Sequence, residues 1–332
     1  MTGEGPSSPV AIRFDPWRHR YTVLLCAATV VLLMAGGLVT STGSGLAVPD
    51  WPLSFGKVFP PMQGGVLFEH GHRLVAATVG MMTVVLAAGY ARRERRRGVR
   101  LLSYAALGAV VLQGALGGLT VLLRLPTSVS VAHACLAQLY FCSVVTLAHL
   151  TSRSFVENRP RPSDSMSGGV LFPCAAGVTV LVYAQLILGA ILRHTGAGLA
   201  IPDVPLAFGR VVPPFLSFEI GIHFAHRVTG VLIGMLVAGL AVLVGREIGR
   251  PDLQRPARAA LALVAVQILL GAASVVTRLA VIPTTAHVVT GALLLATLLT
   301  LTLRSRRAGV WEAQGACPSI GMGRVRRAAG PA

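Results

Sequence analysis

The chain has 332 residues, of which 54% are hydrophobic and 12% are charged, and its formal net charge is +17 at pH 7. This composition is too apolar and too poor in charge for an ordinary soluble domain, so it predicts a polytopic membrane protein. It also argues against a nucleic-acid partner, because the arginines stand in short segments between apolar runs and do not form one basic face.

Eight apolar runs have the length, roughly 17 to 25 residues, that crosses a bilayer. They lie at about residues 21–40, 72–91, 101–122, 130–150, 170–192, 221–245, 259–277 and 285–303. The predicted fold is therefore an all-α membrane protein with eight transmembrane helices.

The sequence contains an internal duplication. The stretch TGSGLAVPDWPLSFG at residues 42–56 returns as TGAGLAIPDVPLAFG at residues 195–209. Four later residues also recur at a fixed spacing: Gln113, Gly117, Arg124 and His133 correspond to Gln267, Gly271, Arg278 and His287. Each copy contains an even number of spans, so both copies enter the membrane in the same sense. The duplication predicts two parallel four-helix-bundle repeats.

The predicted organisation follows from these runs and from the basic residues. It consists of a cytoplasmic N-terminal segment (1–20), an N-terminal four-helix repeat (21–157), a cytoplasmic linker (158–169), a C-terminal four-helix repeat (170–303) and a cytoplasmic tail (304–332). Most of the 29 Lys and Arg residues fall in segments on one side of the eight spans. The positive-inside rule therefore predicts that both termini are cytoplasmic.

Four histidines lie at one predicted depth, on the even-numbered spans: His72, His133, His226 and His287. Each precedes the arginines at the cytoplasmic end of its span by 17 to 20 residues, which is about 25 to 30 Å of helix. Two neutral imidazoles that face each other across a bundle supply both axial ligands of a haem iron. We expect one such pair in each repeat. A zinc site is disfavoured because no third ligand is repeated and the cysteines have no metal-binding spacing.

Three charged residues accompany these histidines. Arg73 and Arg227 directly follow His72 and His226, and they are candidates either to pair with haem propionates or to reach lipid phosphates. Glu69 stands one helical turn before His72, so its side chain is expected to share the face of that histidine and to be a catalytic candidate. The alternative is that Glu69 only stabilises a helix N-terminus.

The loop at 42–56, the E-x-x-H-R of residues 69–73, the H-R pair at 226–227 and the lone His133 and His287 together resemble the haem A synthase family. These are integral-membrane enzymes of cytochrome oxidase assembly, and the resemblance covers about residues 20–303. It implies oxidation of the ring methyl of haem O to the formyl group of haem A. It further implies haem b as cofactor in the second repeat and haem O as substrate in the first.

Residue by residue, the resemblance implies that His226 and His287, with Arg227, bind haem b. It implies that His72 and His133, with Arg73, receive haem O, and that Glu69 lies in the reactive neighbourhood. Many members carry a cysteine pair at the positions of Val48 and Ser54. No thiol or disulfide step is therefore expected here, and the chain resembles the members without outer-loop cysteines.

The resemblance also implies a multi-pass protein of a bacterial-type inner membrane. Its expected partners are the lipid bilayer and haem O, with haem O synthase and cytochrome oxidase assembly factors as further candidates. A homo-oligomer is left open, and no nucleic-acid partner is expected.

Two other functions fit parts of the pattern. A di-haem b-type electron carrier without porphyrin chemistry would also need paired histidines, but the single Glu69 and the long outer loops favour the enzyme. A parallel-repeat transporter would need polar residues near the bilayer midplane. Gln113 and Gln267 are repeated candidates, and hydrogen bonding between helices explains them more simply.

Overall fold

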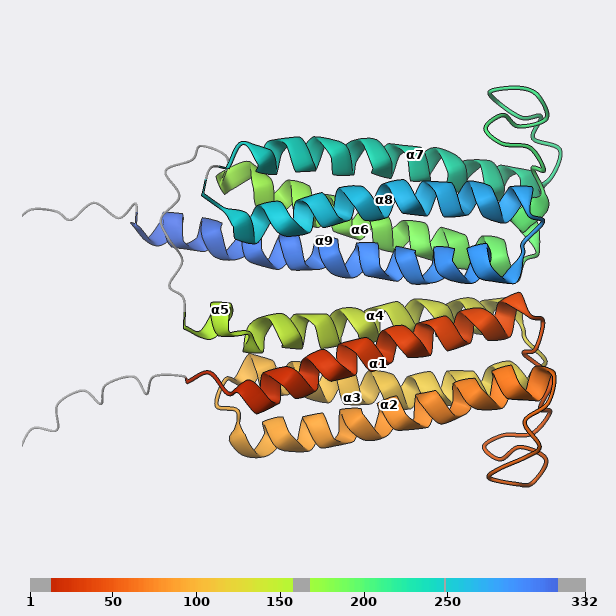
Figure 1. Cartoon of the computed structure of the whole chain (residues 1–332), viewed down its shortest axis with the longest axis horizontal. Coiled ribbons are helices and arrows are strands. Elements are labelled where there is room, and N and C mark those ends of the chain that lie inside the picture. The colour runs from red at the N-terminus through yellow and green to blue at the C-terminus, as the bar shows by residue number, and fades with distance from the viewer. Residues whose placement is uncertain (1–12, 158–167, 248, 316–332) are drawn as a thin grey trace, which may run out of the picture.

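The computed structural model describes residues 13–157, 168–247 and 249–315 (Figure 1). Its long helices are α1 (Pro16–Ser41), α2 (Gly65–Arg93), α3 (Arg97–Leu122), α4 (Thr127–Thr151), α6 (Gly168–His194), α7 (Phe218–Gly245), α8 (Pro251–Val276) and α9 (Val281–Gly315). Two short elements complete the order, α5 (Arg153–Val156) and the 3-10 turn η1 (Ala197–Leu199). Eight of the described helices are long and apolar enough to cross a membrane. The predicted all-α membrane fold with eight spans is confirmed.

The helices are longer than the apolar runs that predicted them. α1 begins at Pro16 because the carboxylate of Asp15 caps it, accepting from the backbone N–H of Trp17 (3.1 Å) and of Arg18 (3.3 Å). α9 continues past residue 303 to Gly315. The predicted boundaries at 20 and 303 therefore fall inside helices. Parts of three predicted segments lie outside the described residues, namely 1–12, 158–167 and 316–332.

The helices form two bundles, α1 to α4 and α6 to α9 (Figure 1). In each bundle every helix packs on the next, and the first packs on the last. The two long loops, 42–64 and 195–217, emerge at the same end of the molecule (Figure 1). We call this the loop end, and the opposite end, with the arginines of the α2–α3 and α7–α8 connections, the arginine-rich end. The two copies are thus parallel, as the duplication predicts.

The bundles meet through α1 and α4 on one side and α6 and α9 on the other. Near the loop end, the guanidinium of Arg193 on α6 donates to the carbonyl oxygen of Gly37 (2.9 Å) and to Oγ of Ser41 (2.8 Å) on α1. The hydroxyl of Thr285 on α9 also donates to Ser41 Oγ, at 3.1 Å. These bonds join the two copies at the level where their loops begin.

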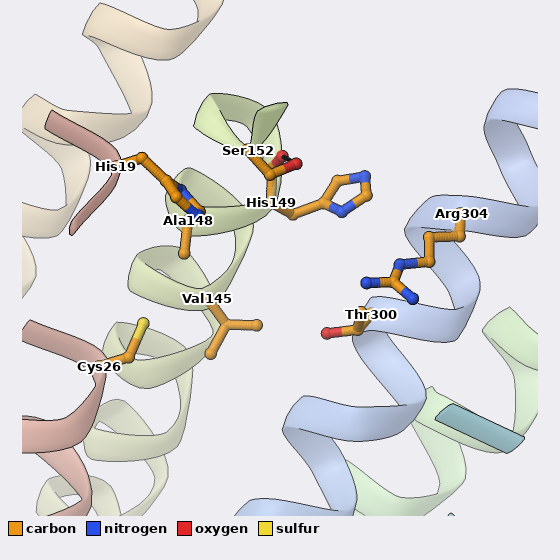
Figure 2. A pocket seen from close by; sticks show the side chains of 8 residues that line it. All are labelled: His19, Cys26, Val145, Ala148, His149, Ser152, Thr300 and Arg304. Atoms are coloured by element: carbon orange, nitrogen blue, oxygen red, sulfur yellow. Dashed lines mark hydrogen bonds between the residues drawn. The ribbon is translucent and has the colours of Figure 1, made fainter. Parts of the chain in front are cut away.

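A cavity of about 250 Å³ lies between α1, α4 and α9 near the arginine-rich end (Figure 2). It is lined by His19, Cys26, Val145, Ala148, His149, Ser152, Thr300 and Arg304. None of the four histidines at the predicted haem depth lines it. This cavity is therefore separate from the histidine sites described below.

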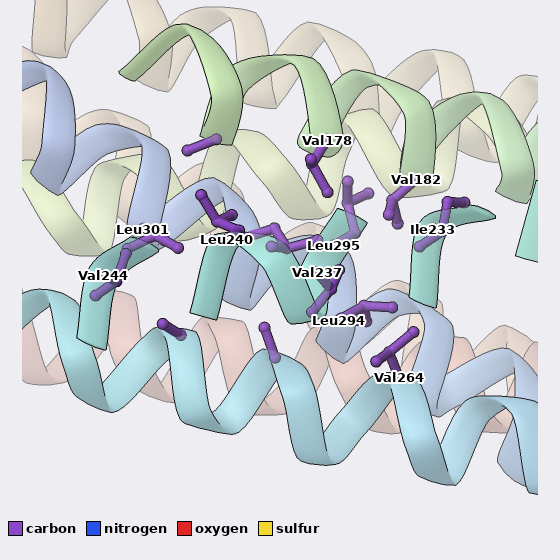
Figure 3. Close-up of a cluster of buried hydrophobic side chains, with 14 of the residues drawn as sticks. Val178, Val182, Ile233, Val237, Leu240, Val244, Val264, Leu294, Leu295 and Leu301 are labelled. Carbon is purple, nitrogen blue, oxygen red and sulfur yellow. The ribbon is translucent and has the colours of Figure 1, made fainter. Parts of the chain in front are cut away.

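The interior of each bundle is filled by apolar side chains, and Figure 3 shows this cluster in the second bundle. Along the four histidine-bearing helices the clusters begin at Val79, Tyr140, Ile233 and Leu294 and continue toward the arginine-rich end. Each of these residues lies seven positions after a predicted ligand histidine, which is about two turns. Among the described residues, the buried apolar clusters therefore stop about two turns short of the histidines.

The membrane orientation gives a first prediction. The basic residues of the arginine-rich end should face the cytoplasm. A fluorescent reporter fused after Gly315 is expected to fold and fluoresce, and a reporter active only in the periplasm is expected to be active when inserted in loop 42–64. Periplasmic activity of a fusion after Gly315 would contradict this orientation and the predicted depth of the histidines.

Candidate functional site

The four predicted ligand histidines occupy equivalent places in the two bundles. His72 lies on α2, His133 on α4, His226 on α7 and His287 on α9. Each is roughly two turns from the start of its helix at the loop end. All four are partly buried. The single depth that the arginine spacing predicts is therefore present in the fold.

Each bundle brings its two histidines near each other, and in the second bundle the two rings face each other. The rings of His226 and His287 have their centroids 6.4 Å apart and their planes at 64°. This separation would accommodate a metal ion bound to both rings. It matches two metal–nitrogen bonds of about 2 Å each plus the distance from each bonding nitrogen to the centroid of its ring. In the first bundle, His72 and His133 are close enough to interact electrostatically. The structure thus brings together the two pairs that the sequence suggests.

The surroundings of the histidines fit a haem. Nδ1 of His72, His133 and His226 is buried and forms no hydrogen bond within the described part of the chain. The apolar clusters stop two turns away, and glycines pack against the rings. Neutral imidazole in an apolar bundle is the donor set that haem iron takes. No group of three or more His, Cys, Asp or Glu that could hold a metal ion was found among the described residues.

Glutamines tie the histidines to the neighbouring helix. Nε2 of Gln113 donates to the carbonyl oxygen of His133 at 2.9 Å, which confirms the expected helix–helix hydrogen bond. Nε2 of Gln185 donates to the carbonyl oxygen of His226 at 2.7 Å. Gln267 contacts the His287 ring itself, because Nδ1 of that ring lies 3.0 Å from the Gln267 carbonyl oxygen. The sequence comparison missed Gln185 because its counterpart in the first copy is Leu32.

Arg73 and Arg227 hold the long loops. Arg73 donates to the carbonyl oxygens of Asp50 (2.8 Å), Leu53 (2.9 Å) and Val48 (3.3 Å). Arg227 donates to the equivalent carbonyl oxygens of Asp203 (2.7 Å), Leu206 (3.1 Å) and Ile201 (2.8 Å). The two arginines therefore organise the loop over each histidine pair. This role differs from the two that the sequence suggested, which were propionate binding and lipid contact.

Glu69 is 3% exposed and lies between Arg73 and the loop. Its Oε1 accepts from Arg73 at 2.6 Å, and its Oε2 accepts from the backbone N–H of Val48 at 2.8 Å. Glu69 is not in the first turn of α2, so stabilisation of the helix N-terminus does not explain its position. In the second bundle, Nδ1 of His223 accepts from the backbone N–H of Ile201 at 3.2 Å. Both residues thus tether a loop, and only Glu69 does so with a carboxylate.

The loop residues Val48 and Ser54, where the resemblance suggested that a cysteine pair is replaced, are held against α2 by hydrogen bonds. Val48 and Ser54 are both 0% exposed. The backbone of Val48 is held by Glu69 and Arg73, and Oγ of Ser54 forms a hydrogen bond of 2.8 Å with Nδ1 of His70. Polar contacts therefore fix the loop where a disulfide is absent.

One aspartate shapes the turn at the tip of each loop. The carboxylate of Asp50 accepts from the backbone N–H groups of Phe55 (2.7 Å) and Gly56 (2.8 Å), and Asp203 does the same for Phe208 and Gly209. Phe55 and Phe208 have φ of 54° and 55°, a region that bulky residues seldom adopt. The carboxylates compensate for this strain by satisfying the turn's N–H groups.

The turn should be sensitive to acid. Hydrogen bonds from the N–H groups of Gly56 and Phe55 hold the pKa of Asp50 below its ordinary value of 3.8. A pKa that is lower in the folded loop stabilises it above the unfolded pKa, and this contribution is lost as the pH falls through the folded value. We expect proteolysis of loop 42–64 to speed up progressively as the pH falls below the ordinary pKa of 3.8, and Asp50→Asn to speed it up several-fold at pH 7. Asp203→Asn is the matched control, since it should affect only loop 195–217; equal effects of both variants on loop 42–64 would contradict the assignment.

Comparison with known proteins agrees with this arrangement. The profile of the COX15-CtaA family, described as cytochrome oxidase assembly protein, matches residues 19–299 and so includes both histidine pairs. The chain belongs to the COX15-CtaA family. Among its relatives, the heme A synthase of Symbiobacterium thermophilum is 35% identical over 253 residues, covering 74% of this chain and 82% of the relative. The heme A synthase of Geobacillus kaustophilus is 31% identical over 296 residues, covering 85% and 90%.

A more distant relative matches over nearly the full length. The heme A synthase of Methylobacterium radiotolerans is 28% identical over 374 residues, covering 97% of both chains. The match between these COX15-CtaA proteins therefore includes the two bundles and the loops above them.

The two bundles of this COX15-CtaA protein differ where the loop meets α3 in the first bundle and its counterpart α8 in the second. The indole of Trp51 lies directly on Gly118 of α3, since a Cβ atom added at Gly118 would be 2.8 Å from the ring. The second copy has Val204 and Ala272 at these positions. The larger loop residue, tryptophan, thus packs on the smaller helix residue, glycine, in the first bundle. The second bundle has valine and alanine at these positions, so it has no indole there.

Proposed function

We propose that the protein is a haem A synthase, which oxidises the ring methyl of haem O to the formyl group of haem A for cytochrome oxidase assembly. The observation that carries the proposal is a pair of neighbouring histidines in each of two parallel four-helix bundles. It is supported by membership of the COX15-CtaA family and by similarity to proteins named heme A synthase. The enzyme is an oxidoreductase that works inside the bilayer, with both termini in the cytoplasm of a bacterial-type cell.

We propose that the second bundle holds haem b through His226 and His287. Arg227 acts indirectly, by fixing loop 195–217 above the pair. The bound haem supplies one-electron redox chemistry within the membrane. The protein supplies two ligands in a fixed relation and an apolar bundle that excludes water.

We propose that the first bundle receives haem O between His72 and His133. Arg73 and Glu69 hold loop 42–64 above this pair, and Trp51 covers α3 beside it. The Glu69 carboxylate is the charged group one turn from His72. It is the candidate to relay a proton or to stabilise positive charge that develops as the methyl group is oxidised.

The proposed partners are the enzyme that supplies haem O and the factors that deliver haem A to cytochrome oxidase. A homo-oligomer would leave each histidine pair within a single chain, because each pair is formed inside one bundle.

Extraction of the haems from the purified protein tests the proposal. Production in a bacterium that makes haem O but has no haem A synthase of its own should yield haem A, together with haem b bound to the protein. The inactive control is the double variant His72→Leu/His133→Leu, which should keep haem b and lose haem A. Haem b alone in the wild-type protein would favour the di-haem electron carrier instead.

A further inference from the structure

Each ligand histidine rests on a glycine of the preceding helix. A Cβ atom added to the glycine would lie 3.1 to 3.3 Å from Cε1 of the histidine ring, for the pairs Gly36–His72, Gly117–His133, Gly189–His226 and Gly271–His287. In all four pairs Cε1 is the nearest ring atom and Nδ1 the second. Every ring therefore presents the same edge to its glycine, although the helices around it differ in sequence.

We propose that these glycines, each with the residue four positions before it, are seats that fix the orientation of the haem-ligating imidazoles. The four seats are Leu32 with Gly36, Gln113 with Gly117, Gln185 with Gly189, and Gln267 with Gly271. They are positioning residues that act through the histidines. The inference rests on the proposed function, because it assigns the histidines to haem.

The seat of His287 adds a hydrogen bond to this close contact, whereas Nδ1 of the other three histidines forms no hydrogen bond within the described residues. Residues four apart share a helix face, and the missing side chain at Gly271 exposes the backbone carbonyl of Gln267 to the ring. Nδ1 of His287 lies 3.0 Å from that carbonyl oxygen, within hydrogen-bond distance. A bond at Nδ1–H fixes the tautomer and leaves Nε2 as the basic nitrogen, the usual arrangement for a metal-ligating histidine.

The seats also differ between the bundles. Glutamine side chains bind His133, His226 and His287 or their backbone, whereas the seat of His72 has Leu32 in place of glutamine. Glutamine side chains therefore bond to both histidines of the second bundle, at the backbone of His226 and the ring of His287, but only to the backbone of His133 in the first. A resident cofactor gains from two fixed ligands, while a substrate haem has to be released. This difference supports haem b in the second bundle, where the ring of His287 is itself bound by Gln267.

The test uses the purified full-length protein with its bound haem b. Gly189→Ala and Gly271→Ala place a methyl group so close to the rings that His226 or His287 has to move by a few tenths of an ångström. We expect a shifted low-spin electron paramagnetic resonance signal and about tenfold weaker haem retention, the effect typical of changing the residues that orient metal ligands.

Gly177→Ala on α6 and Gly239→Ala on α7 are matched controls, because nothing lies within 4 Å of their added Cβ atoms. The controls should keep the wild-type signal and melt at the same or a higher temperature, since alanine favours a helix over glycine.

A second variant keeps the test decisive if an alanine variant does not accumulate. Gln185→Leu copies the Leu32 seat, leaves the space beside His226 unchanged and removes only the 2.7 Å tether. It should release haem b to an apo-haem acceptor faster than the wild type. The proposal would be contradicted if Gly189→Ala, Gly271→Ala and Gln185→Leu all kept the wild-type electron paramagnetic resonance signal and the wild-type rate of haem b release. Failure of the proposed function would differ, because the wild type would then lack haem b or keep it after His226→Leu.

Discussion

Replacing His226 or His287 by leucine is expected to remove most of the haem b spectrum from the purified protein. Each change deletes one of the two proposed ligands, whose rings face each other with centroids 6.4 Å apart. Leucine supplies no lone pair, so the remaining imidazole would hold the iron alone and the low-spin, six-coordinate state would be lost. Absorption and electron paramagnetic resonance spectra of the two variants measure this directly.

Three controls separate a lost ligand from a damaged fold. His149→Leu changes a histidine at the arginine-rich end, beside the separate cavity, and should leave the haem b spectrum unchanged (Figure 2). His72→Leu and His133→Leu should also keep haem b while abolishing haem A formation. An unchanged spectrum in both His226→Leu and His287→Leu, with loss in the other pair, would move the resident haem to the first bundle.

The parts of the fold that the sequence predicts are those recorded by periodicity and repetition. Apolar length alone predicts the eight spans, since a helix has to cover the bilayer thickness. The duplication predicts two parallel bundles, and the distance of His72 and His226 from the arginines predicts their shared depth. These features depend on composition along one helix or on comparison of two copies, and so they need no knowledge of which side chains meet.

Contacts between loops and helices could not be predicted in this way. Arg73 and Arg227 bind backbone carbonyl oxygens of loop residues that lie up to 25 and 26 positions earlier in the chain. Every residue has such a carbonyl group, so the sequence does not show which ones an arginine binds. Glu69 and His223 occupy equivalent positions in the two copies of the sequence, but their shared role was not predictable: both accept from a loop N–H, although one is a carboxylate and the other an imidazole. Gln185 was missed since its copy, Leu32, has a different chemistry.

Glu69→Gln is expected to leave haem b in place and to abolish haem A, with haem O or a partly oxidised intermediate accumulating. The carboxylate now accepts from both Arg73 and the Val48 N–H, and an amide has only one oxygen for these two donors. One donor would therefore face another, at a cost of about 1 to 3 kcal/mol for an unsatisfied buried group. Glutamine thus removes the charge and also loosens the loop, so this variant alone does not separate the two roles.

Glu69→His separates the charge from the loop tether, because the second bundle already has a histidine that tethers its loop. There, Nδ1 of His223 accepts from the loop N–H of Ile201, so a histidine at position 69 should tether Val48 in the same way without a carboxylate. Proteolysis of loop 42–64 measures the tether, and extracted haems measure the reaction. If the carboxylate serves the chemistry, Glu69→His protects the loop like the wild type and still makes no haem A. Haem A at the wild-type rate from Glu69→His would reduce Glu69 to a loop tether, and the catalytic group would then have to lie elsewhere around the His72–His133 pair.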